Sequence, residues 1–111
     1  MSNLYLANAF SLSMLLSEKE SIVKIKRISA AQAEILLKEK HFISAVGHAS
    51  TAEILQELLF LEVPVNRVAI QLQPGDKVVV FQLKTRLPEG KVLSKEEISS
   101  LDWDFFLVEL L

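Results

Sequence analysis

The stretch Phe42-Ile-Ser-Ala-Val-Gly-His-Ala-Ser-Thr51 decides the fold that the sequence predicts around it. Its apolar residues 42–46 predict a short strand, which ends at Gly47. A helix is expected directly afterwards, because Ser50 and Glu53 fit a capping box. In that motif a serine and a glutamate side chain satisfy backbone N–H groups of the first helical turn. The stretch therefore predicts a strand that leads through His48 into a helix.

Two further segments carry the same cap pattern, Ser29-Ala-Ala-Gln32 and Ser94-Lys-Glu-Glu97. Together with the first stretch they predict helices over about residues 30–40 and 51–61, and a short third helix after Ser94. Apolar residues recur at helical spacing in the first two helices, so one face of each should pack against a sheet.

Strands are expected where apolar residues alternate or run together, over residues 4–7, 22–28, 42–46, 67–73, 77–83 and 103–110. The last of these segments could instead be a short helix. The sequence Gln73-Pro-Gly-Asp76 predicts a type II turn, which would join the two strands beside it into an antiparallel hairpin. The expected fold class is α/β, with a mixed β-sheet of about five strands and helices packed mainly on one face.

Length and composition narrow the possible functions. The chain of 111 residues fits a single domain, residues 1–111, and its 12 basic and 14 acidic residues give a net charge of −2. Duplex DNA is not an expected partner, because duplex-binding proteins usually carry a clear basic excess. A small anionic ligand in a local basic pocket stays possible. The chain contains no cysteine, no plausible set of metal ligands, and no apolar segment long enough to span a membrane.

His48 is a candidate acid–base group, because it follows a strand and precedes a helix. The N–H groups and the dipole at a helix start favour a phosphate, and Ser50 and Thr51 add hydroxyl groups there. A second candidate pair, Arg86 and Glu89, follows the predicted strand 77–83. Arginine offers a planar fork of donors that matches a phosphate. Each of these residues could alternatively be an ordinary loop residue, and the spacing alone does not bring them together.

Four segments in the same order carry a more specific set of motifs: Leu4-Tyr-Leu-Ala-Asn-Ala-Phe-Ser-Leu-Ser-Met14, Phe42-Ile-Ser-Ala-Val-Gly-His-Ala-Ser-Thr51, Val63-Pro-Val-Asn-Arg67 and Phe81-Gln-Leu-Lys-Thr-Arg-Leu-Pro-Glu-Gly90. In these motifs the chain resembles the viral ring nucleases, which are anti-CRISPR proteins of archaeal viruses and phages. The resemblance covers nearly the whole chain.

The resemblance implies a small α/β homodimer with a ligand pocket across the dimer interface. The implied ligand is cyclic tetra-adenylate, the second messenger of type III CRISPR complexes, which the family cleaves without a metal or another cofactor. Such an enzyme would act in the cytoplasm of the host. By the family's motifs, His48, Arg86 and Glu89 would be catalytic, and Asn8, Ser11, Arg67 and Gln82 would line the pocket. The hydroxyl groups of Ser50 and Thr51, expected at the helix start, would join them as substrate-binding groups.

The chemistry that the resemblance implies suits these residue types. The substrate supplies its own nucleophile, a ribose 2′-hydroxyl next to the scissile phosphodiester. His48 would protonate the departing 5′-oxygen and Arg86 would stabilise the negative charge that develops on the phosphate. Glu89 would either orient His48 or assist proton removal from the 2′-hydroxyl. The expected products are short oligoadenylates that end in a 2′,3′-cyclic phosphate.

Two other functions are compatible with the same sequence. A protein that only sequesters the cyclic messenger would share the pocket but lack the chemistry. A viral regulator that binds nucleic acid is a further alternative, although the weakly acidic net charge of −2 argues against it.

Overall fold

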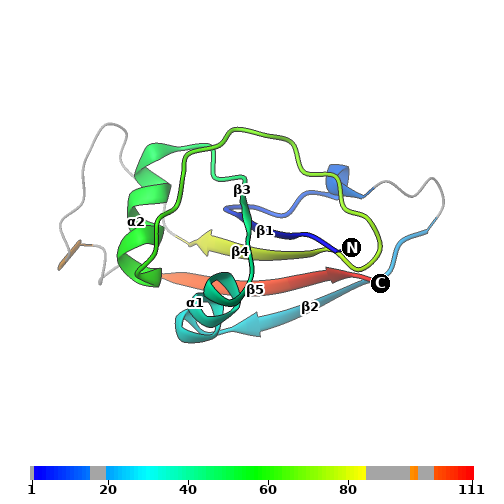
Figure 1. The fold of residues 1–111 in the computed structure, drawn as a ribbon, viewed down its shortest axis with the longest axis horizontal. Helices are drawn as coiled ribbons and strands as arrows, with labels where there is room; N and C mark the ends of the chain where they lie inside the picture. The colour runs from blue at the N-terminus through cyan, green and yellow to red at the C-terminus, as the bar shows by residue number, and fades with distance from the viewer. Residues whose placement is uncertain (1, 16–19, 85–95, 98–101) are drawn as a thin grey trace.

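A five-stranded mixed sheet forms the centre of the computed structural model, which describes residues 2–15, 20–84, 96–97 and 102–111 (Figure 1). Its strands are β1 (Leu4–Ala7), β2 (Val23–Ile28), β3 (Ile43–Ser44), β4 (Lys77–Leu83) and β5 (Trp103–Leu110). They lie in the order β2-β5-β4-β1-β3. Strand β1 runs parallel to β3 and β4, whereas β5 runs antiparallel to β4 and β2. The predicted fold class, a mixed sheet of about five strands, is confirmed.

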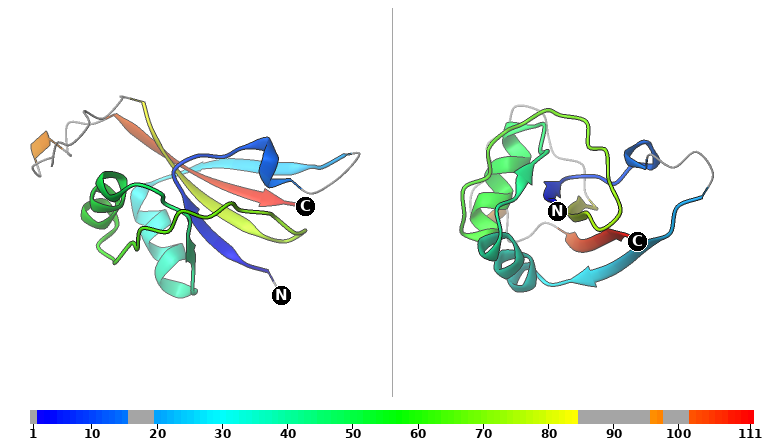
Figure 2. Two further views of the ribbon diagram at one scale, coloured as in Figure 1. Left: turned by 90° about the horizontal axis from the view of Figure 1, so that it is seen from above. Right: turned by 45° about the vertical axis from the view of Figure 1, so that its right-hand side comes forward.

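Two helices, α1 (Ala30–Glu39) and α2 (Ala49–Leu59), cover one face of this sheet (Figure 2). The opposite face is covered in part by extended segments and by a short 3₁₀ helix, η1 (Leu12–Met14). The helices therefore lie on one face, as the sequence predicted.

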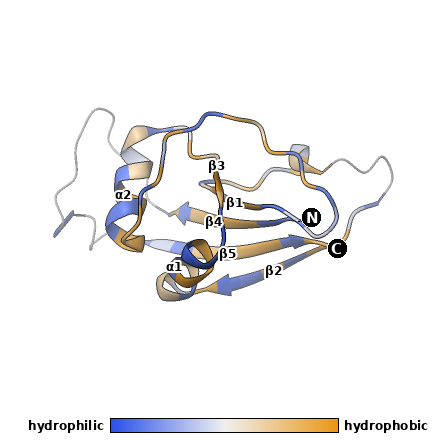
Figure 3. Ribbon diagram, in the orientation of Figure 1, coloured by the Kyte–Doolittle hydropathy of each residue, from blue (hydrophilic) through white to orange (hydrophobic). Residues whose placement is uncertain are grey.

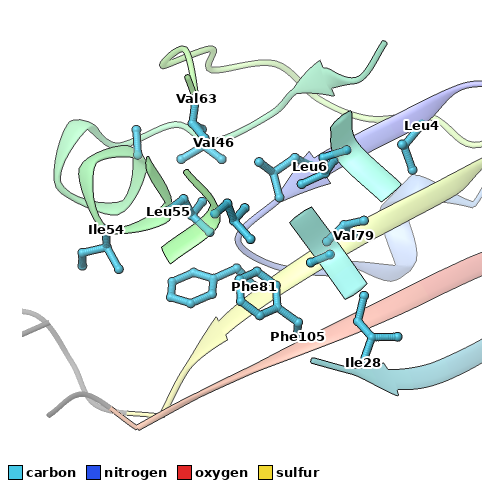
Figure 4. Close-up of a cluster of buried hydrophobic side chains, with 14 residues drawn as sticks. Leu4, Leu6, Ile28, Val46, Ile54, Leu55, Val63, Val79, Phe81 and Phe105 are labelled. Carbon is cyan, nitrogen blue, oxygen red and sulfur yellow. The ribbon is translucent and has the colours of Figure 1, made fainter. Parts of the chain in front are cut away.

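The middle of β4 is a run of hydrophobic residues (Figure 3), so this strand supplies both faces of the sheet with apolar side chains. Val79 and Phe81 pack beneath the helices, where the ring of Phe81 lies 5.1 Å from that of Phe105 (Figure 4). Val78 and Val80 pack on the other face. All four side chains are buried, as expected for a central strand.

The predicted strand over residues 67–73 is wrong, and the antiparallel hairpin that depended on it is wrong as well. This segment is extended, but its backbone makes only one bridge within the described residues, between Leu72 and Leu15. Ile70 and Leu72 are nevertheless buried against the sheet. The alternation thus reflects a segment that packs on a sheet face rather than one paired edge to edge. The predicted turn does form, with Gly75 at a φ of +94°.

Helix starts were predicted with mixed success. Ser29 and Gln32 form the expected capping box at α1. The box predicted at Ser50 does not form, because α2 begins two residues earlier and His48 occupies the cap position. The helix is thus displaced toward the N-terminus, Ala49–Leu59 in place of the expected 51–61, and keeps the same length of 11 residues. The predicted third helix lies mostly outside the described residues, of which Glu96 and Glu97 are helical.

One predicted strand is shorter in the structure, and another is confirmed with its bounds. The strand expected over residues 42–46 is limited to Ile43–Ser44. Beyond it the chain turns away from β1 through Ala45, whose N–H still donates to Leu6 O at 2.8 Å. The segment 103–110 is a strand over its full length, so the alternative of a short helix is excluded.

Candidate functional site

The parallel strands β3, β1 and β4 place the polar residues that follow them at one edge of the sheet. Neighbouring parallel strands end at the same edge, and ligand sites of such sheets form just beyond those ends. Asn8 follows β1 directly, and Gln82 belongs to the last residues of β4. His48 follows β3 after a short loop and opens α2, which lies beside this edge (Figure 1).

A pocket of about 500 Å³ lies at this edge and contains three of the predicted binding residues. Asn8, Thr51 and Gln82 all line it, although they come from three separate elements. Thr51 is buried, Asn8 is half-buried and Gln82 is exposed. The pocket therefore offers two amide side chains and one hydroxyl to a ligand, so it could bind both a base edge and a phosphate.

The other side of the pocket is apolar and was not predicted. Besides the three polar residues it is lined by Ala9, Phe10, Ile25, Val80, Phe81, Leu83, Phe106 and Val108. The guanidinium of Arg27 lies 5.3 Å from the centre of the Phe106 ring. Alternation along β5 could have indicated Phe106 and Val108, since both side chains share the sheet face that the helices leave free.

His48 precedes the first turn of α2, one turn before Thr51. Its backbone carbonyl accepts a hydrogen bond from Ala52 N at 3.1 Å, but its side chain caps no N–H group. The imidazole is exposed, as is Ser50 in the second helical position. The first-turn N–H groups have no partner within the helix itself. The imidazole is thus available to a ligand at the helix start.

Arg67 lies against the loop that leads into His48. A Cβ atom placed on Gly47 would meet Arg67 Cγ at 3.5 Å and Arg67 Nε at 3.6 Å. The arginine side chain therefore passes over Gly47, the residue directly before His48. Arg67 is exposed, so its guanidinium is accessible at the same edge of the sheet.

Ser11 occupies a different position from the other predicted binding residues. It caps η1, and its hydroxyl lies 2.9 Å from the hydroxyl of Ser13. Ser13 lines a neighbouring hollow of about 340 Å³ that shares Asn8 with the first pocket. Ser11 lines neither of the two, but its chain neighbour Phe10 lines the first pocket and its hydroxyl partner Ser13 lines the second hollow.

Arg86 and Glu89, the other two predicted catalytic residues, lie outside the described residues. Lys84 follows β4 directly and is a further cation near the ends of the strands. Its ammonium lies 3.2 Å from an Asp104 oxygen and 3.8 Å from an Asp102 oxygen. That cation is therefore engaged with the start of β5.

The described residues form neither a metal-binding cluster nor a membrane-spanning helix. Within residues 2–15, 20–84, 96–97 and 102–111, no three His, Asp or Glu side chains are grouped so that they could bind a metal ion. Among the helices of the same ranges, none has the length and hydropathy needed to cross a membrane.

Comparisons with known proteins relate the chain to viral proteins. It is 40% identical over 108 residues to protein 26 of Sulfolobus islandicus filamentous virus, with 96% of this chain and 91% of that protein covered. It is 34% identical over 109 residues to the ORF117 protein of Acidianus two-tailed virus, with coverages of 96% and 92%.

A solved structure shares the fold over almost the whole chain. B116 of Sulfolobus turreted icosahedral virus (STIV) superimposes with a TM-score of 0.83 at 29% sequence identity, covering 97% of this chain and 99% of B116. The family model described as STIV B116-like matches residues 4–105. The chain therefore belongs to the STIV B116-like family.

Proposed function

We propose that this protein is a metal-independent ring nuclease, which binds cyclic tetra-adenylate in the host cytoplasm, cleaves it, and so suppresses type III CRISPR immunity. One observation carries the proposal. Asn8 and Gln82, which the ring-nuclease motifs predict as ligand-binding residues, line one pocket together with Thr51, which the helix start predicts, although the three are distant in sequence. The predicted general acid, His48, lies one helical turn from Thr51.

The chemistry of the pocket suits an adenine nucleotide. Amide side chains such as those of Asn8 and Gln82 can donate to and accept from the edge of an adenine at the same time. The start of α2 provides N–H groups and a positive dipole end for a phosphate. Relatives in viruses of Sulfolobus and Acidianus agree with a protein that acts against host immunity.

The size of the pocket favours a homodimer as the active form. Its volume of about 500 Å³ falls within the range of about 300–1,000 Å³ that is usual for single drug-sized ligands. A ring of four nucleotides is larger than such a ligand. Two copies of the pocket related by a two-fold axis could each hold half of the ring, because the ring repeats its own structure.

The proposed reaction needs no external nucleophile. The 2′-hydroxyl of one adenosine attacks the adjacent phosphorus, the bond from phosphorus to the 5′-oxygen breaks, and a 2′,3′-cyclic phosphate forms. His48 donates a proton to the departing 5′-oxygen. Arg86 would stabilise charge on the phosphate, and Glu89 would orient His48 or accept the proton of the 2′-hydroxyl. The roles of these last two residues rest on the motif resemblance alone.

The test compares the two histidines of the chain. Purified protein is incubated with cyclic tetra-adenylate in the presence of a chelator, and the products are identified by mass spectrometry. We expect His48→Ala to lower single-turnover cleavage by about 10²–10⁴-fold, the usual contribution of a general acid, while ligand affinity is largely kept. His41→Ala is the matched control, because His41 lines a different hollow beyond the C-terminal end of α1. Unchanged cleavage by His48→Ala would remove His48 from the mechanism.

The same assay distinguishes the alternative functions. Single turnover with the protein in excess would return an intact ring if the protein only sequesters the messenger. Duplex DNA or RNA that binds with a steep dependence on salt, in place of the cyclic ligand, would identify a nucleic-acid-binding regulator. Either result would contradict the proposed enzyme.

A further inference from the structure

The segment that follows α2 is fastened to β3 and to the loop beyond it by side chains outside the pocket. Ser44 Oγ donates to Pro64 O at 2.6 Å, and Asn66 Nδ2 donates to Ser44 O at 2.7 Å. The backbone N–H of Asn66 also donates to Val46 O at 2.8 Å. Ser44 is buried and Asn66 is half-buried, so these bonds are shielded from water.

These bonds fix the backbone on both sides of the contact between Arg67 and Gly47. Asn66 precedes Arg67, and Val46 precedes Gly47, so the bond from Asn66 N to Val46 O lies next to that contact. The Asn66 side chain adds a second bond two residues earlier, to Ser44 O at the end of β3. With the two backbones held in this way, the stem of Arg67 lies within 3.5–3.8 Å of the Cβ position of Gly47.

We infer that Asn66 is a positioning residue, which holds Arg67 across Gly47 beside His48 and so prepares the guanidinium to receive a phosphate of the ligand. An unrestrained arginine side chain loses rotamer entropy when it is fixed. Restraint of its backbone and stem before binding reduces that loss. The ligand part of this inference rests on the proposed function, whereas the restraint of Arg67 belongs to the free protein.

The first arm of the test uses the protein without ligand. The ¹⁵N heteronuclear NOE of the Arg67 Nε–H group reports whether the side chain is restrained. We expect a high value in the unmodified protein and a clearly lower value in Asn66→Ala. Asn3→Ala is the matched control, since Asn3 also uses its side-chain amide, in an exposed bond to Tyr5. Equal values in the unmodified protein and in Asn66→Ala would overturn the inference.

The second arm is a double-mutant cycle on the affinity for cyclic tetra-adenylate. Asn66→Ala should weaken binding by roughly 10-fold, which is within the usual coupling range of neighbouring residues. In the Arg67→Ala background, the same substitution should change affinity less than about two-fold, because no guanidinium remains to be positioned. A merely structural role would give the same loss in both backgrounds, and that result would also overturn the inference.

If Asn66→Ala does not fold, the milder variant Ser44→Ala tests the same restraint of Arg67. Ser44→Ala removes the bond to Pro64 O but keeps the backbone acceptor of Asn66. It should lower the NOE of Arg67 in the same direction and by a smaller amount, and an unchanged value would count against the inference. If the unmodified protein does not bind cyclic tetra-adenylate, the proposed function fails, while the ligand-free NOE still decides whether Asn66 positions Arg67.

Discussion

Asp76 offers the sharpest test of what stabilises the sheet at the start of β4, the end of that strand opposite the pocket. Its side chain is 1% exposed and accepts two backbone hydrogen bonds, from Asn3 N at 2.8 Å and from Gln73 N at 2.9 Å. Its backbone carbonyl accepts from Leu110 N at 3.1 Å. One buried carboxylate thus joins the start of β1 to the turn before β4, while its backbone binds the end of β5.

Asp76→Asn changes this site without changing its shape. The amide of asparagine can accept only one of the two bonds, because its nitrogen is a donor and would face another donor. One bond to a charged acceptor is lost, which costs about 1.5–3 kcal/mol, and one buried N–H is left without a partner. We expect the free energy of unfolding to fall by about 2–4 kcal/mol. For a chain of this length that corresponds to a decrease in Tm of roughly 8–16 °C.

Urea unfolding followed by circular dichroism measures this loss, with Asp102→Asn as the control. The Asp102 side chain is 68% exposed and lies 3.8 Å from Lys84, so the same chemical change there should cost less than about 1 kcal/mol. Asp76 lies at the opposite end of β4 from the pocket, so ligand binding by the folded variant should be unchanged. A loss for Asp76→Asn no greater than that for Asp102→Asn would refute the reasoning.

Four further substitutions test the pocket and the local backbone. Thr51→Val keeps the buried shape but removes the hydroxyl, so affinity for cyclic tetra-adenylate should fall by roughly 10-fold in calorimetry with little change in Tm. Gly47→Ala should be tolerated within about 1 kcal/mol, since the new Cβ would meet Arg67 at ordinary contact distances, whereas Gly75→Ala should cost about 1–2 kcal/mol because its φ of +94° disfavours a side chain. Ser29→Ala should cost about 1 kcal/mol in urea unfolding, since it removes the capping box of α1.

Local patterns were sufficient for several elements of this fold. The run of apolar residues in β4 and the alternation in β5 predicted both strands with their observed bounds. At α1 the exposed Ser29 and Gln32 satisfy the first turn by themselves, so a local motif was enough there. At α2 the same motif failed, because the helix begins at Ala49 and His48, not Ser50, occupies the cap position.

Patterns of burial did not reveal which strands are paired. Ile70 and Leu72 are buried as alternation predicts, but a segment that covers a sheet face buries alternate residues as well as a paired strand does. The hairpin prediction failed for that reason. Asn8 and Gln82 in the polar half of the pocket were predictable only through motif resemblance, because they meet through the parallel pairing of β1 and β4, which spacing does not reveal. Thr51 was already indicated by the expected helix start.

The central place of β4 has a consequence for synthesis of the protein. β4 is inserted between β1, near the beginning of the chain, and β5, which in turn is the strand that attaches β2. On the ribosome, β1 and β2 must wait for residues up to 110 to emerge before either can join a completed sheet. The pocket needs Asn8, Gln82 and Phe106 together, so a nascent chain has none until Phe106 has emerged.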